Sequence, residues 1–314
     1  MKNILLLGTG GTIASVPSED GLVPALSGEE IIRLVPKLKG LCTIDYKELF
    51  NLDSSNLEPK HWQIMAKAVE ENYEKYDGFV ITHGTDTMAY TAAALSFMLE
   101  NCKKPVVLTG AQLPIEAKGS DAPANVLHAF MTACSEAVGV ILTFGDRVIS
   151  GFNAKKMSTE DFNGFISVNE EALGTIEGDK ITWNYEAMAK EEDIKGKFTA
   201  EIALEEKVAV VKLIPGSKAD ILEYYADNGY KGIVLESFGA GGVPNAENNW
   251  LPMLEKVIKK GVTVVCATQC IFDGVDLHKY PIGSLAEKLG ARSAGRYTIE
   301  AATTGLMHEL GKKC

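Results

Sequence analysis

Three short turns of the sequence carry hydroxyl side chains that could act as nucleophiles. The turns are "GTGGT" at 8–12, "LDSSN" at 52–56 and "THGTDT" at 82–87. A hydroxyl needs a base to take its proton, and a lysine can be this base where burial and neighbours lower its pKa. Two lysines follow in "NAKKM" at 153–157. The residue types therefore favour a hydroxyl nucleophile that works with an acid and a lysine.

The glycine-rich first turn could instead bind a phosphate group. Gly8 and Gly10 fit the dinucleotide-binding fingerprint, but Ile13 stands where that fingerprint needs its third glycine. The segment 15–24 contains two prolines and a glycine, so no helix is expected to begin there. What remains is either a polar turn or a nucleophile, Thr9 or Thr12, beneath a mobile loop.

The turn "THGTDT" has a plainer interpretation as the start of a helix. Asp86 could be an N-cap, with Thr87 helping, because short polar side chains satisfy the first free N–H groups of a helix. A cap does not account for the second hydroxyl, on Thr85, or for the preceding histidine. We interpret His83 as structural, since none of the histidines pairs clearly with a serine and an acid.

Apolar runs alternate with amphipathic segments through the first half of the chain. The apolar runs predict strands at 3–8, 43–50, 78–84, 105–112 and 139–145. Apolar residues that recur at spacings of three and four predict helices at 58–76, 86–102 and 121–137, with Asp86 and Asp121 as N-caps. Such alternation is typical of a parallel sheet covered on both faces, which binds ligands at the carboxyl ends of its strands. The polar turns should therefore meet in one crevice.

A charged, weakly periodic stretch at 181–207 interrupts this alternation. Three further strands are then predicted at 208–216, 232–242 and 262–269. We predict an α/β protein with a larger N-terminal domain, mostly a parallel sheet with flanking helices, and a smaller C-terminal α/β domain. The predicted bounds are 1–185 for the catalytic domain, 186–207 for a linker and 208–314 for the second domain.

Composition and charge favour a small molecule as the partner. The 314 residues are 46% hydrophobic and 23% charged, as in an ordinary globular protein, and the net charge of −11 disfavours nucleic acid and anionic membranes. No signal peptide and no membrane span is recognisable, so we expect a cytoplasmic protein. Six scattered cysteines favour reduced thiols, and Cys266 and Cys270 lack a second pair for a metal. We expect neither a metal nor a cofactor.

Five segments together carry a resemblance to a known family. "TGGTIAS", "LDSSN", "HGTDTMAYTA", "LTGAQLP" and the lysine of "NAKKM" occur in this order. In this the sequence resembles the bacterial-type L-asparaginases, and within them the cytoplasmic type I branch. The resemblance extends over essentially the whole chain. It implies hydrolysis of the side-chain amide of L-asparagine to L-aspartate and ammonia, without a cofactor.

The resemblance also implies a role for each matching residue. Thr12 would be the nucleophile that forms an acyl-enzyme, and Thr85, Asp86 and Lys156 would form a second, rigid triad that activates a hydroxyl or water. The substrate-binding positions implied in the same way are Asp53, Ser54, Ser55, Thr85, Asp86 and Ala111. Ser54 and Asp86 would hold the α-carboxylate and α-amino groups. The backbone N–H groups of Thr85 and Ala111 would donate to the developing oxyanion.

Two positions depart from the family pattern. The loop over the site usually carries a tyrosine that orients the nucleophile, but Leu22 stands at that position. We expect Tyr280 to be either its catalytic substitute or a structural residue. Some type I relatives bind asparagine at a second site through an arginine, where this chain has Glu236, although Cys270 is retained. A carboxylate there would repel the effector, so we expect a hyperbolic dependence of rate on asparagine.

Alternative functions remain open. The chain could be a glutaminase, the asparaginase-like subunit of a tRNA-dependent amidotransferase, or an inactive amino-acid sensor. The subunit carries an extra N-terminal domain in its family, whereas this chain begins at the first strand, and a sensor needs no lysine base. The resemblance further implies a homodimer or homotetramer.

Overall fold

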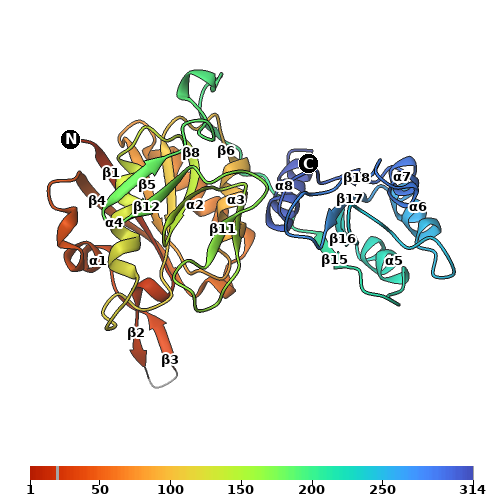
Figure 1. Ribbon diagram of the computed structural model, residues 1–314, viewed down its shortest axis with the longest axis horizontal. Helices are drawn as coiled ribbons and strands as arrows, with labels where there is room; N and C mark the ends of the chain where they lie inside the picture. The colour runs from red at the N-terminus through yellow and green to blue at the C-terminus, as the bar shows by residue number, and fades with distance from the viewer. Residues whose placement is uncertain (19–20, 314) are drawn as a thin grey trace. The chain divides into compact units, whose positions relative to one another are not determined.

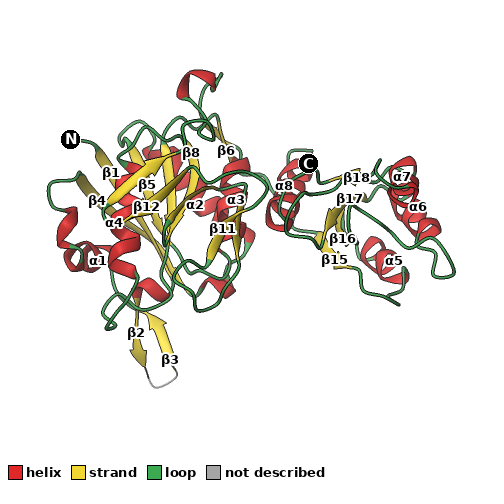
Figure 2. Cartoon of the chain, viewed as in Figure 1, coloured by secondary structure: helices red, strands yellow, loops and turns green. Residues whose placement is uncertain are grey.

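The computed structural model describes residues 1–18 and 21–313. The chain divides into two compact units, Met1–Ile202 and Ala203–Cys314 (Figure 1). Both units contain a largely parallel sheet with helices on its faces (Figure 2). The predicted fold class is therefore confirmed.

The first unit is built on an eight-stranded sheet. Its parallel part has the order β4 (Thr43–Leu52), β1 (Asn3–Gly10), β5 (Gly78–Thr82), β7 (Pro105–Thr109) and β8 (Gly139–Phe144). Three antiparallel strands extend it beyond β8, namely β9 (Arg147–Ser150), β12 (Gly174–Glu177) and β13 (Lys180–Trp183). All five predicted strands form. The apolar runs of β1, β5, β7 and β8 are buried on both faces, whereas β4 at the edge of the sheet has no buried residue.

Helices cover both faces of this sheet. They are α1 (Gly28–Leu34), α2 (Pro59–Asn72), α3 (Met88–Met98) and α4 (Ala122–Ala133). On one face, side chains such as Ile4, Val80 and Val107 form a core with α1 and α4. Helix α2 packs on α3 and β4, and α3 packs on β7 and β8. Because the helices lie on the faces of the sheet, the turns that follow the strands lie at its carboxyl edge.

Several short elements were not predicted. They are η1 (Thr12–Ala14), η2 (Pro36–Leu38), η3 (Ser54–Asn56), η4 (Glu191–Asp193) and the paired strands β2 (Ser15–Ser18) with β3 (Gly21–Pro24), β10 (Ala154–Lys156) with β11 (Phe165–Ser167), and β6 (Leu99–Glu100) with β14 (Thr199–Ala200). The loop expected at 15–24 thus forms a hairpin, of which residues 19 and 20 lie outside the described residues. The linker predicted at 186–207 stays a prediction.

The second unit has a smaller, wholly parallel sheet. Its strands lie in the order β15 (Val208–Lys212), β16 (Gly232–Ser237), β17 (Thr263–Thr268) and β18 (Arg292–Ser293). The helices of this unit are α5 (Asp220–Asp227), α6 (Leu251–Lys259), α7 (Pro281–Lys288) and α8 (Ile299–Gly311). Ala302 and Leu306 of α8 pack on one face of the sheet, and the other three helices contribute to the core on the other face.

Candidate active site

The turn after β1 brings the chain very close to the turn after β5. Gly11 has φ of 81°, which favours glycine, and its N–H donates to the carbonyl of Leu52 at 3.0 Å. A Cβ on Gly11 would lie only 2.4 Å from the backbone nitrogen of Gly84. Thr12 follows and is half-buried, and its hydroxyl makes no hydrogen bond with another described residue. The Thr12 hydroxyl is therefore not engaged by any side chain or backbone group in the described part of the chain.

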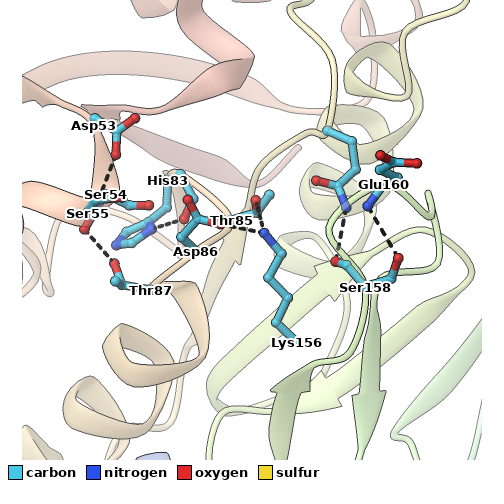
Figure 3. Close-up of polar contacts among 12 residues, drawn as sticks. Asp53, Ser54, Ser55, His83, Thr85, Asp86, Thr87, Lys156, Ser158 and Glu160 are labelled. Atoms are coloured by element: carbon cyan, nitrogen blue, oxygen red, sulfur yellow. Dashed lines mark hydrogen bonds and ion pairs between the residues drawn. The ribbon is translucent and has the colours of Figure 1, made fainter.

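The turn after β4 reaches the same point. Ser54 is buried, and a Cβ on Gly84 would lie 2.6 Å from its Oγ. The Thr87 hydroxyl donates to the carbonyl of Ser54 at 2.9 Å. Asp53 accepts from the backbone N–H of Ser55 at 2.8 Å, which fixes the turn (Figure 3). Glycine at 84 is thus what permits the approach of the two turns.

Lys156 connects this region to the strand pair β10 and β11. Its Nζ donates to Thr85 Oγ1 at 2.8 Å and to Asp86 Oδ1 at 2.6 Å (Figure 3). The side chain of Lys156 is 16% exposed and that of Asp86 is 61% exposed. A buried amine in contact with a buried hydroxyl can receive a proton through it, while the exposed carboxylate can accept from a cationic ligand.

The interpretation of Asp86 as a helix cap is wrong. Helix α3 begins at Met88 and its N-cap is Thr87, with no side-chain capping bond. The carboxylate of Asp86 contacts Lys156 instead. A charge-assisted hydrogen bond to a lysine 70 residues away takes the place of the local cap, as the triad implied by the family resemblance requires.

The turn after β7 is held by a buried carboxylate. Ala111 is 1% exposed, and the next two backbone N–H groups, of Gln112 and Leu113, donate to Asp121. Asp121 occupies the N-cap position of α4, as predicted, but makes no capping bond there. Asn125, one turn later, also donates to Asp121 at 3.0 Å. This support was not predicted from the sequence. Its only signal there is a pair of polar residues, Asp121 and Asn125, four positions apart.

His83 lies beneath the site and is fully buried. One ring nitrogen, Nδ1, is 2.6 Å from the carbonyl oxygen of Gly84, and Nε2 is 2.8 Å from Thr91 Oγ1. Burial lowers the pKa of His83 to about 4, so the ring is neutral near pH 7. A neutral, buried imidazole agrees with the structural role expected for it.

The remaining predicted residues lie in other places. Tyr280 belongs to the second unit, at the start of α7, and is 54% exposed. Glu236 lies on β16 opposite Lys212, whose Nζ is 3.4 Å from Glu236 Oε1, a cation that sequence reasoning missed. Leu22 is on β3, and its side chain lies outside the described residues. The roles expected of these positions stay predictions.

Neither a metal cluster nor a membrane span is found in the described part of the chain. No group of three or more His, Cys, Asp or Glu side chains there could hold a metal ion. Within the same residues, no helix is both long and apolar enough to cross a bilayer.

Known proteins resemble both units of the chain. Residues 3–189 match the family model described as "Asparaginase, N-terminal", and residues 207–314 match "Glutaminase/Asparaginase C-terminal domain". An L-asparaginase of Thermococcus kodakarensis is 38% identical over 98% of this chain and 92% of its own. A subunit of the glutamyl-tRNA(Gln) amidotransferase of Pyrococcus furiosus is 37% identical over 99% of this chain and 72% of its own.

A solved structure extends the likeness to three dimensions. The thermostable L-asparaginase from Thermococcus kodakarensis superposes with a TM-score of 0.91 at 37% identity, covering 98% of this chain and 93% of that one. With both family models matched, and with the turns after β1 and β5 in contact, the chain belongs to the asparaginase family.

Proposed function

We propose that this chain hydrolyses the side-chain amide of free L-asparagine to L-aspartate and ammonia, through an acyl-enzyme on Thr12. The observation that carries the proposal is the contact of Lys156 with Thr85 and Asp86, beside the turn that presents Thr12. This is the combination of nucleophile, buried base and acid that amide hydrolysis requires. Family membership supports the same reaction class, an amidohydrolase.

The first half-reaction transfers the acyl group to Thr12. Its Oγ attacks the amide carbon, and the hydroxyl proton passes to a base while the tetrahedral intermediate forms. When the C–N bond breaks, the leaving nitrogen takes a proton and departs as ammonia. A threonine ester of aspartate remains.

The second half-reaction consumes one water molecule. Thr85, in contact with Lys156 at 2.8 Å, passes the proton of water to the amine, and hydroxide attacks the ester carbon. The C–O bond to Thr12 then breaks, and Oγ takes the proton that the amine received from water. A positioned base of this kind is worth about 10²–10⁴-fold in rate.

Substrate binding is assigned to the polar turns after β4 and β5. The exposed carboxylate of Asp86 can accept from the α-ammonium group, and the Ser54 hydroxyl can donate to the α-carboxylate, with Ser55 beside it. Asp53 fixes this turn through its bond to the Ser55 N–H. The N–H groups of Thr85 and Ala111 are assigned to the oxyanion.

Ammonia release from L-asparagine tests the proposal directly. We expect the wild-type chain to release ammonia, Thr12→Ala to lose turnover while remaining folded, and Thr12→Ser to retain a measurable rate because it keeps a hydroxyl. A Thr12→Ala variant that keeps a tenth of the wild-type turnover would exclude Thr12 as the nucleophile.

The amidotransferase subunit is a second candidate, favoured by the relative from Pyrococcus furiosus. This chain spans 72% of the length of that protein. The same assay separates the candidates, with L-glutamine and the D-amino acids as further substrates. Release from free L-asparagine favours the asparaginase, release mainly from L-glutamine favours a glutaminase, and release from neither favours an amidotransferase component or a sensor.

We also place the protein in the cytoplasm as a homo-oligomer. The five cysteines that the structure describes are all free thiols, which is typical of a reducing compartment. Self-association is what the family resemblance implies. Asparagine breakdown would then be an intracellular, catabolic reaction.

A further inference from the structure

Two backbone N–H groups assigned to the oxyanion are without a protein partner. Neither the N–H of Thr85 nor that of Ala111 donates to any residue that the structure describes. Both residues are buried, at 7% and 1% exposure. Buried N–H groups are nearly always paired in folded proteins, so a pair without acceptors indicates a place where a ligand oxygen binds.

The two groups are close to each other in space. His83 N–H donates to the carbonyl of Thr109 at 2.8 Å, which joins the strands that precede the two turns. A Cβ on Gly110 would lie 3.5 Å from Thr85 Cγ2. The peptide groups Gly84–Thr85 and Gly110–Ala111 therefore lie on adjacent turns.

A buried side chain donates to the carbonyl of the first peptide group. His83 Nδ1 is 2.6 Å from the oxygen of Gly84, and a carbonyl can only accept, so Nδ1 carries the proton. Trp62 Nε1–H donates to Thr91 Oγ1 at 2.9 Å, and Thr91 Oγ1 is 2.8 Å from His83 Nε2. In the neutral ring Nε2 can only accept, so the Thr91 hydroxyl donates to it. A directed chain thus runs from Trp62 to the carbonyl of Gly84.

The second peptide group has the same arrangement. Asn125 Nδ2 donates to the carbonyl oxygen of Gly110 at 3.0 Å, and Asn125 is 1% exposed. Its Oδ1 accepts from the N–H of Gly145 at 3.1 Å, and Nδ2 also donates to Asp121 Oδ2 at 3.0 Å. These bonds fix which end of the amide is the donor.

We propose that His83 and Asn125 are positioning residues, which orient and polarise the two peptide groups whose N–H donors stabilise the oxyanion. The inference rests on the proposed function. A peptide whose carbonyl accepts a hydrogen bond becomes a stronger donor at its N–H, by about 10–30% of a bond, because hydrogen bonds in a chain polarise one another. The bonds also hold the donors in place before charge develops, which is the main source of oxyanion stabilisation.

Two substitutions of His83 separate this role from simple core filling. His83→Asn places an amide nitrogen near the position of Nδ1, so the bond to Gly84 can be kept while the contact with Thr91 is lost. His83→Gln places its amide near Nε2, so the contact with Thr91 can be kept while the bond to Gly84 is lost. Asparagine is one methylene smaller than glutamine and leaves the larger cavity, so a loss of rate confined to His83→Gln cannot come from lost core volume.

Steady-state kinetics with L-asparagine, with thermal unfolding as the measure of folding, provide the test. We expect His83→Gln to lower kcat about tenfold or more with KM nearly unchanged, since removing a whole oxyanion donor costs about 10²–10³-fold. We expect His83→Asn to stay within about threefold of wild type. Asn125→Asp, which keeps Oδ1 and loses the donor, should show the same loss of kcat as His83→Gln.

The outcomes distinguish the inference from the proposed function. A wild type that releases ammonia, with His83→Gln and His83→Asn equal in kcat, would overturn the inference and leave the function standing. An Asn125→Asp variant with normal kcat would show that Asn125 is not a positioning residue. A wild type that releases no ammonia would overturn the function and the inference together.

Discussion

At the scale of single residues, the proposed hydrolysis depends on Lys156 and its two partners, Thr85 and Asp86. The amine lies between a hydroxyl and a carboxylate, at 2.8 and 2.6 Å, and is largely buried. Asp86 accepts a hydrogen bond from the amine and so holds it in place, and Thr85 provides the path for a proton. The two lysines of β10 point to different neighbours, because successive side chains of a strand face opposite sides.

Replacing Lys156 with methionine tests its role as the base. Met keeps most of the length but removes the amine, so we expect kcat to fall by about 10²–10⁴-fold while the protein stays folded. Lys155→Met is the matched control on the neighbouring position of the same strand and should retain the wild-type rate. A normal kcat in Lys156→Met would move the role to Lys155 or to solvent.

The second prediction concerns His83 and the way the free energy of unfolding depends on pH. Its pKa is about 4 in the folded protein and near 6.5 when unfolded, so the unfolded chain binds more protons between these values and stability falls as the pH is lowered through this window. We expect the His83 contribution to lower the free energy of unfolding by about 2 kcal/mol between pH 7 and pH 5. Urea unfolding at both values checks this.

The control for this measurement is His83→Asn, which has no titrating group at the position. Other groups contribute equally to both proteins, so the difference between their pH dependences isolates His83. Equal pH dependences would mean that the ring is charged, or exposed, in the folded protein.

At this scale the sequence reveals residue types but not contacts. Thr12, Thr85, Asp86 and Lys156 were all selected from short motifs. The contact of Asp86 with Lys156 was expected only from the family resemblance, because the local sequence signal at Asp86 favours a helix cap and says nothing of a partner 70 residues away. The donors behind Gly84 and Gly110 were missed for the same reason.

At the scale of elements, the site depends on how closely the turn after β1 can approach the turn after β5. Gly11 and Gly40 both have a positive φ, of 81° and 85°. A Cβ on Gly11 would collide with the backbone of Gly84, whereas a Cβ on Gly40 would meet nothing within 4 Å. A side chain would be strained at both positions, but only at Gly11 would it also collide with a neighbouring turn.

This pair of glycines gives the third prediction. Gly11→Ala should push the two turns apart and lower kcat about 10²-fold, because a misplacement of about 1 Å can cost that much. Gly40→Ala should cost only the backbone strain, about 1 kcal/mol in the free energy of unfolding, with a normal rate. Kinetics and urea unfolding of both variants distinguish the effects, and equal rates would contradict the argument.

The long elements of both units follow from periodicity, and the short ones do not. Continuous apolar runs identified β1, β5, β7 and β8, since strands buried on both faces need them, while the exposed edge strand β4 was identified from a mixed sequence. The hairpin of β2 and β3 has prolines and few apolar residues, which favour a loop by any local rule. The antiparallel extension by β9, β12 and β13 depends on long-range pairing, for which short strands carry little signal.

On the scale of the whole molecule, exposed apolar side chains are unevenly distributed among the described residues. The second unit is the smaller one, yet four of them lie on or just after its edge strand and on the helix that follows it. Val210 on the edge strand β15 is 39% exposed, Ile214 after it is 59% exposed, and α5 carries Ile221 at 37% and Tyr224 at 61%. An edge strand flanked by exposed apolar groups favours association with another chain.

The final prediction is that a second copy of this chain covers that edge. We expect the wild type to sediment at twice the mass of one chain or more, and Tyr224→Lys to weaken self-association at least tenfold, because an ammonium would be desolvated in an apolar interface. Tyr185→Lys changes a side chain that is 71% exposed on the first unit and is the matched control. A monomeric wild type, or a Tyr224→Lys variant that associates as tightly as Tyr185→Lys, would show that this edge is not an interface.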